Sequence, residues 1–134
     1  MRTAELSIDM SIRRLADLTG EVRAFVGESP SDGLVHVFVP HATAGLALME
    51  TGSGSEEDLE DALERLFPRD NRYRHAHGSR GHGADHLLPA FLAPSLSVPV
   101  VGRALMLGTW QSVVLVDPNR DNQVRRVILS FLEG

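Results

Sequence analysis

Apolar and polar residues alternate along several stretches of the chain, which is the pattern of β-strands. Near the N-terminus, Leu6, Ile8, Met10 and Ile12 alternate with polar side chains, which predicts a half-buried strand with one solvated face. The run at 34–39 is apolar on both faces apart from His36, which predicts a strand in the middle of a sheet. Further strands are predicted at 45–49, 95–100, 104–107, 110–116 and 123–132.

Three short helices are predicted between these strands. Thr19 can cap a helix that runs to about Gly27. Ser55 and the acids after it predict a second helix start, and an apolar stripe at helical spacing continues to Phe67. A third helix is predicted at about 85–92, with Pro89 in its first turn or shortening it.

These elements predict one domain over residues 1–134. The fold class is α+β, a compact sandwich built on a mixed or mainly antiparallel sheet with about three short helices. The chain also offers more apolar strand than one small sheet face can cover, which favours self-association.

Composition excludes several classes of function. Among 134 residues, 13 basic and 18 acidic side chains give a net charge of -5, which argues against a nucleic-acid partner. There is no cysteine, and every basic residue is arginine, so thiol catalysis, lysine Schiff-base chemistry and a P-loop are excluded. No apolar run is long enough for a membrane span and the N-terminus lacks a signal-peptide pattern, so we expect a cytoplasmic protein with no membrane partner.

Histidines are concentrated in a polar loop. Four of the six fall within twelve residues, namely His75, His77, His82 and His86. Without cysteine, imidazole and carboxylate are the only ligands for a first-row metal, and Asp85 could ligate or orient a neighbouring ring. The alternative is a solvated loop with no ligand. Gly81 and Gly83 argue against one continuous helix that presents both His82 and His86.

Other candidate residues lie at strand ends. His41 follows the buried strand and Pro40, where it serves either chemistry or a hydrogen bond to a turn. His36 is predicted to be a satisfied core or interface histidine. The segment 108–111, Gly-Thr-Trp-Gln, suggests either a bulge that presents Thr109 and Gln111 to a ligand or a core tryptophan packed at a kink. Four charges next to strands are predicted to be mostly solvated, although one arginine beside a histidine site would suit a phosphate: Glu50, Asp117, Arg125 and Arg126.

Taken in chain order, these motifs resemble one family. They are Val37-Phe38-Val39-Pro40-His41-Ala42-Thr43-Ala44, Glu50, the helix at Asp58, Tyr73-Arg74-His75, Asp85-His86-Leu87, the strand at 95–100, Gly108-Thr109-Trp110-Gln111 and Arg125-Arg126. The chain resembles the YjbQ-like proteins, an uncharacterised family, over almost its whole length.

The resemblance implies compact α/β sandwiches that assemble as homotrimers and carry a histidine-rich site that often holds a metal ion. For a divalent ion, an imidazole-rich site without thiolate suits zinc or nickel. Some members are associated with a weak thiamine-phosphate synthase activity, which joins a pyrimidine diphosphate to a thiazole phosphate. By matching position, His41, His75 and His86 are the expected metal or anion histidines. Other residues would line the same cavity: Thr43, Glu50 and Arg125 as catalytic residues, and Thr109 and Gln111 as binding residues.

This chain departs from the family pattern at a few positions. Ala42 replaces a usual threonine, Met49 replaces a usual asparagine, and extra histidines follow His75. His77 or His82 therefore replaces or supplements His75 in one interpretation.

Two kinds of function follow. In the first, a metal-dependent enzyme acts on a small phosphorylated metabolite, with Arg125 holding charge and a histidine or Glu50 moving a proton. In the alternative, a trimer binds a metal or an anion without turnover, or serves as an interaction subunit.

Overall fold

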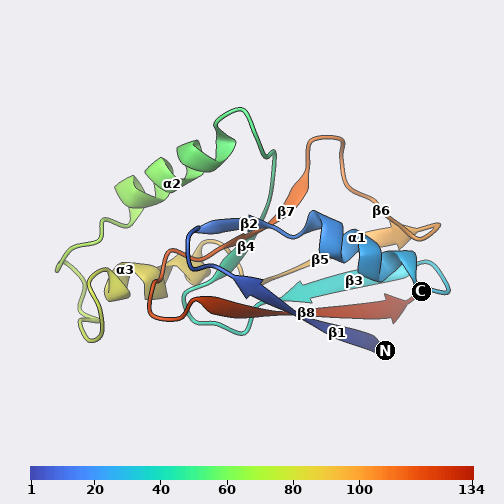
Figure 1. Cartoon of the computed structure of the whole chain (residues 1–134), viewed down its shortest axis with the longest axis horizontal. Helices are drawn as coiled ribbons and strands as arrows, with labels where there is room; N and C mark the ends of the chain where they lie inside the picture. The colour runs from blue at the N-terminus through green and yellow to red at the C-terminus, as the bar shows by residue number, and fades with distance from the viewer.

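A five-stranded antiparallel sheet forms one layer of the protein (Figure 1). The computed structural model describes residues 1–134. Its strands, in spatial order, are β1 (Arg2–Asp9), β8 (Val124–Glu133), β3 (Gly33–Phe38), β5 (Ser95–Val101) and β6 (Ala104–Leu105). β3 lies between β8 and β5, so the apolar run at 34–39 is central in the sheet, as predicted.

A three-stranded antiparallel sheet forms the second layer. Its order is β2 (Leu15–Asp17), β7 (Ser112–Val116) and β4 (Gly45–Met49). β7 begins two residues later than predicted because residues 108–111 form a turn, in which the Gln111 amide donates to the Gly108 carbonyl at 3.1 Å. Thus both sheets are antiparallel, and the predicted α+β class is confirmed.

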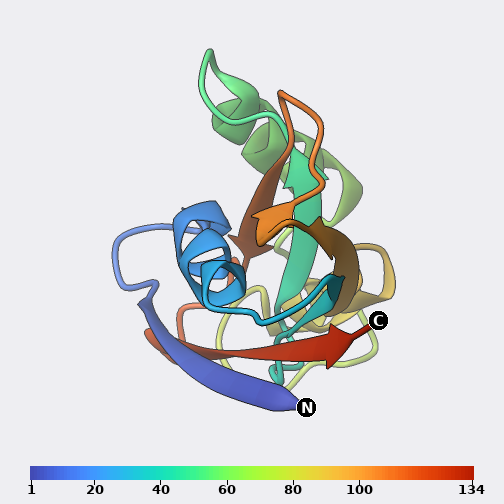
Figure 2. The same cartoon turned by 90° about the vertical axis from the view of Figure 1, so that its right-hand side faces the viewer.

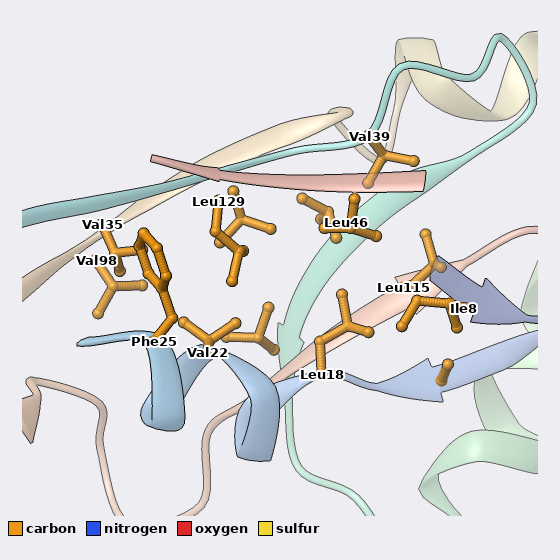
Figure 3. Packing of buried hydrophobic residues seen from close by; sticks show 14 of the residues in the cluster. Ile8, Leu18, Val22, Phe25, Val35, Val39, Leu46, Val98, Leu115 and Leu129 are labelled. Carbon is orange, nitrogen blue, oxygen red and sulfur yellow. The ribbon is translucent and has the colours of Figure 1, made fainter. Parts of the chain in front are cut away.

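The core lies between the sheets and helix α1 (Thr19–Gly27) (Figure 2). Val22 and Phe25 of α1 point toward β3 and β5, where Val35 and Val98 face them (Figure 3). Each side chain of this size stabilises the fold by about 1.5–3 kcal/mol when fully buried. Alternate residues of β3, β5 and β8 therefore supply most of the driving force for this layer.

The helix starts differ from the predicted capping. The Asp17 carboxylate accepts from the Thr19 amide at 2.9 Å and from its hydroxyl at 2.6 Å, so Asp17 takes the capping role that the sequence suggested for Thr19. Helix α2 (Ser55–Leu66) follows Gly54 in the left-handed conformation, at φ 90°, and Ser55 makes no capping bond.

Helix α2 packs on the three-stranded sheet away from the main core (Figure 1). Its Leu59 and Leu63 contact a small cluster that includes Leu88 and Val114. After a long loop, α3 (His82–Leu87) and the 3-10 helix η1 (Leu88–Ala90) return the chain to this cluster. None of the helices has the length and apolarity that crossing a bilayer requires.

The outer face of the five-stranded sheet carries apolar side chains. Leu34 is 44% exposed and pairs with Leu132, which is 45% exposed, and Phe38 is 37% exposed on the same face. Between them, His36 Nδ1 lies 2.9 Å from Ser97 Oγ. No element of the chain covers this face.

Candidate functional site

Three histidines converge where the polar loop meets α3. One ring nitrogen from each of His75, His82 and His86 lies within 4.8 Å of the others. The ring centres of His82 and His86 are 4.1 Å apart, and the His77 ring centre lies 4.3 Å from that of His75. Zinc–nitrogen bonds of about 2.1 Å place tetrahedral ligand atoms roughly 3.3 Å apart, so small side-chain movements would let the three rings hold one ion.

Helix α3 presents His82 and His86 together, so the expectation that Gly81 and Gly83 prevent this is wrong. Gly81 lies just before the helix at φ 85°, and it starts the helix at His82. Gly83 is needed for close approach, because a Cβ there would lie 2.5 Å from the His75 carbonyl oxygen. Both glycines therefore help to bring His75 against the helix.

The chemistry of the three rings fits a metal ion. Both ring nitrogens of His82 are buried and have no hydrogen-bond partner, which is costly unless something binds them. Burial lowers the pKa of His75 and His86 below that of free histidine, and the neighbouring histidines lower it further. The rings of His75 and His86 therefore favour the neutral form, which is the form that ligates metals.

Asp85, between the two histidines on α3, does not point at the cluster. Its carboxylate is 1% exposed, forms an ion pair with Arg69 and accepts from Asn119 Nδ2 at 2.9 Å. Burial raises the pKa of Asp85, while the bonds from Asn119 and Arg69 oppose that rise. Asp85 thus anchors α3 to the rest of the domain, and the orienting role expected of it is indirect.

His41 lies beside the cluster rather than within it. Its Nε2 accepts from the Arg126 amide at 2.8 Å, so in the neutral ring Nδ1 carries the proton. Nδ1 lies 3.5 Å from Arg125 Nη1, which is also a donor. Burial and then the charge of Arg125 lower the pKa of His41. Two donors thus meet here without an acceptor between them.

Arg125 is held in place by a buried network. It is 3% exposed and forms an ion pair with Asp117, which is 2% exposed. Thr43 bridges them, because its Oγ1 accepts from Arg125 Nη2 at 3.2 Å and donates to Asp117 Oδ1 at 2.9 Å. Asp117 is therefore not the solvated charge that the sequence suggested, and Arg125 matches the alternative of an arginine beside a histidine. Their burial requires the pairing that the structure shows.

One pocket joins the histidine cluster to this network. It has a volume of about 250 Å³, and it is lined by His82 and His86 of the cluster together with His41, Thr43 and Arg125. A ligand in this pocket would contact imidazoles and a guanidinium at once.

Three predicted site residues lie elsewhere. Glu50 follows β4, and Thr109 and Gln111 precede β7, at the end of the three-stranded sheet where Met49 pairs with Ser112. Asp117 follows the other end of β7. The five residues of β7 separate it from Gln111, and six steps along an extended strand span roughly 20 Å. Within one chain, therefore, Glu50, Thr109 and Gln111 do not line the pocket of His41 and Arg125.

The structure also decides between the interpretations of Trp110 and Arg126. Trp110 is 73% exposed in a turn shaped by the Gln111 side chain, whose Oε1 accepts from the Gly108 amide at 2.9 Å, so the core interpretation is wrong. Arg126 lies on the surface and pairs with Glu5 at 2.5 Å, as expected of a solvated charge.

Sequence reasoning missed Asn119, which connects the two parts of the site. Its amide donates to Asp117 Oδ1 at 3.0 Å, while its side chain donates to Asp85. The available signal was the pattern Asp117-Pro118-Asn119-Arg120-Asp121 after a buried strand, because alternating Asp and Asn residues often bond nearby amides in turns.

Comparison with known proteins supports the resemblance over the full domain. The family model described as "UPF0047 protein YjbQ-like" matches residues 4–134. A UPF0047 protein of Mycobacterium tuberculosis is 65% identical over 134 residues and covers 100% of both chains. One from Archaeoglobus fulgidus is 34% identical over 129 residues and covers 96% of this chain and 99% of its own.

Solved structures of similar proteins share the fold of this chain. A hypothetical protein from Aeropyrum pernix has a TM-score of 0.88 at 30% identity, with 100% of both chains covered. A conserved hypothetical protein from Thermus thermophilus has a TM-score of 0.82 at 30% identity, with 96% of this chain and 99% of that one covered. Since sequence and fold match from end to end, this chain belongs to the UPF0047 family of YjbQ-like proteins.

Proposed function

We propose that this protein binds a divalent metal ion, zinc or nickel, and acts on a small phosphorylated molecule beside it. The observation that carries the proposal is that one pocket is lined both by the imidazoles of His82 and His86 and by the donors of Arg125 and His41. The proposed metal ligands are His75, His82 and His86, whose donor atoms lie within 4.8 Å of one another. Imidazole ligands without thiolate suit zinc or nickel.

His41, expected to be a ligand, is instead assigned to the anion. Its Nε2 is occupied by the Arg126 amide, and its Nδ1 proton points beside Arg125. An anionic oxygen between Nδ1 and Nη1 would accept from both, which removes the donor–donor mismatch. Arg125 Nη1 is the free arm for this, because Asp117 and Thr43 engage the other two nitrogens.

A metal bound here would supply positive charge that polarises a phosphoryl oxygen or neutralises a leaving group. Arg125 would orient the anion, and Thr43 and Asp117 would hold the guanidinium still. His41 would donate its Nδ1 proton to the anion. Joining a pyrimidine diphosphate to a thiazole phosphate, as in weak thiamine-phosphate synthase activity, is one reaction of this class, since both reactants carry phosphate and one releases pyrophosphate.

The alternative is a non-catalytic protein that holds the metal and an anion in the same pocket. The two functions share every contact described above and differ only in turnover. Incubating zinc-loaded protein with both thiamine precursors, and assaying thiamine phosphate and released pyrophosphate, separates them.

We further propose a homotrimer. The exposed apolar side chains Leu34, Phe38 and Leu132 on the outer sheet face support self-association. In a cyclic assembly, Glu50, Thr109 and Gln111 of one copy are available to complete the site of another.

The metal proposal is tested by elemental analysis of untagged protein after addition of zinc. We expect one zinc per chain, lost in His82→Ala and His86→Ala and kept in His36→Ala, whose ring lies on the outer sheet face. No stoichiometric metal in the wild type would overturn the proposal.

The anion proposal is tested by thermal shift with phosphate, pyrophosphate, thiamine precursors and carboxylates, with and without zinc. Phosphorylated compounds should raise the melting temperature of the wild type and of His36→Ala. They should have a much smaller effect on His41→Ala. Stabilisation by neutral or cationic compounds alone would contradict the phosphate proposal.

A further inference from the structure

The carboxylate nearest the histidine cluster is Asp121, in the loop between β7 and β8. Its Oδ2 lies 3.7 Å from His82 Nδ1, too far for a hydrogen bond as it stands and within reach of a small movement. No other group bonds to His82, since both of its ring nitrogens are buried without a partner. Asp121 is therefore the acceptor available to the Nδ1 proton.

The Nδ1 edge of the His82 ring also lies against the backbone of Gly78. Gly78, at φ 82°, lies so close that a Cβ on it would be 2.6 Å from His82 Nδ1. This edge of the ring is thus confined between the Gly78 backbone and Asp121. The opposite nitrogen, Nε2, is left for the cluster with His75 and His86.

Asp121 is itself held by Asn119. Its amide donates to Asn119 Oδ1 at 2.9 Å, and Asn119 Nδ2 lies 3.4 Å from Asp121 Oδ2. The same Asn119 nitrogen bonds to Asp85 on α3 at 2.9 Å. One buried amide therefore fixes both the helix that carries His82 and the carboxylate that faces its ring.

We propose that Asp121 is a positioning residue for the metal site: it accepts the Nδ1 proton of His82 and directs Nε2 of that ring to the ion. This inference rests on the proposed function, because it requires a metal at the histidine cluster. A carboxylate behind a ligating histidine fixes the tautomer and makes the ring a stronger ligand. In this arrangement Asp121 contacts no metal.

The test compares zinc affinity, measured by competition with a chromophoric chelator, in the wild type, Asp121→Ala, Asp121→Asn and Asp61→Asn. Asp121→Ala removes the acceptor, so we expect binding about 10–100-fold weaker. Asp121→Asn keeps an acceptor oxygen without its charge and should bind with intermediate affinity. Asp61 is exposed on α2, and its variant loses the same charge, so it should bind within about twofold of the wild type.

Two controls separate the outcomes. Circular dichroism and melting of the zinc-free proteins should be alike, because Asp121 is 40% exposed and its loss should not unfold the domain. A wild type that binds no zinc overturns the metal proposal together with this inference. A wild type that binds zinc while Asp121→Ala binds it equally well overturns the positioning role alone. A crystal structure of the zinc-loaded protein with Asp121 on the ion, or with the ion on Nδ1, also overturns it.

Discussion

The hydroxyl of Thr43 is expected to hold the buried ion pair together, and two substitutions at this position separate the hydroxyl from the methyl group. The residue is 6% exposed, and its Oγ1 contacts both Asp117 and Arg125. Thr43→Val keeps the volume and deletes both hydrogen bonds. Thr43→Ser keeps both bonds and deletes one methyl group.

The magnitudes follow from these contacts. In Thr43→Val, Arg125 Nη2 loses its acceptor, and Asp117 Oδ1 keeps only the bond from the Asn119 amide. Hydrogen bonds to charged groups contribute about 1.5–3 kcal/mol each, and the buried valine offsets part of the loss, so we expect a cost of about 2–4 kcal/mol. Thr43→Ser should cost about 1 kcal/mol, from one buried methyl group.

The assay is urea unfolding of zinc-free protein at pH 7 and a fixed protein concentration. The dependence of the unfolding free energy on urea concentration should be the same in all variants. Domains of this kind are stable by about 5–15 kcal/mol, so both variants should fold and be measurable. If Thr43→Val is as stable as Thr43→Ser, or more stable, the hydroxyl does not bridge the pair and the network described here is wrong.

Three further outcomes are expected. The stability of the zinc-free protein should fall as the pH is lowered through the ordinary histidine value of 6.5, because burial lowers the pKa of His41 and the unfolded chain then binds more protons than the folded one. Urea midpoints between pH 5 and 8 check this, with a flatter profile in His41→Gln than in His36→Gln; a profile that rises on acidification would contradict it. Gly45→Ala should destabilise by at least about 1–3 kcal/mol, since its Cβ would lie 2.2 Å from the Leu92 carbonyl oxygen, whereas Gly20→Ala meets no atom within 4 Å and should be neutral or stabilising in thermal melts; equal melting temperatures would refute the packing described. Light scattering coupled to size exclusion should give about three times the chain mass, and Leu34→Glu on the outer sheet face should lower it, while a wild-type mass near 14.6 kDa at micromolar concentration would rule out the trimer.

The strands were predictable where the chain itself carries the pattern. The apolar run at 34–39 predicted a central strand, and β3 does pair with β8 on one side and with β5 on the other. The start of β7 was not predictable from pattern alone. Trp110 and the residues beside it look like strand, but Gln111 folds its own side chain back onto Gly108 and closes a turn. The predicted capping by Thr19 was also not realised, because its hydroxyl accepts instead from the Val113 amide of β7 at 2.9 Å.

The candidate site was predictable in part. Clustering in sequence pointed to the histidines, because a loop brings near neighbours together in space. The buried network was not visible, since Thr43 and Asp117 are 74 positions apart and Asp85 and Asn119 are 34 apart. Pairs so distant leave no periodic signal in one sequence. Isolated charges beside strands are usually solvated, and only the fold shows that these face each other.

The buried Arg125–Asp117 pair makes sense as a device for orientation rather than for stability. A well-packed apolar pair of similar volume is often as stable as a buried ion pair, because removing two charges from water is costly. In this protein the pairing fixes the guanidinium of Arg125. Its Nε and Nη2 are held by Asp117 and Thr43, and its Nη1 lies beside His41 Nδ1. Because Asn119 bonds to both Asp117 and Asp85, the same network also fixes the helix that carries His82 and His86. The arginine and the imidazoles therefore keep one relative geometry before any ligand arrives, which would reduce the ordering cost of binding the proposed anion between them.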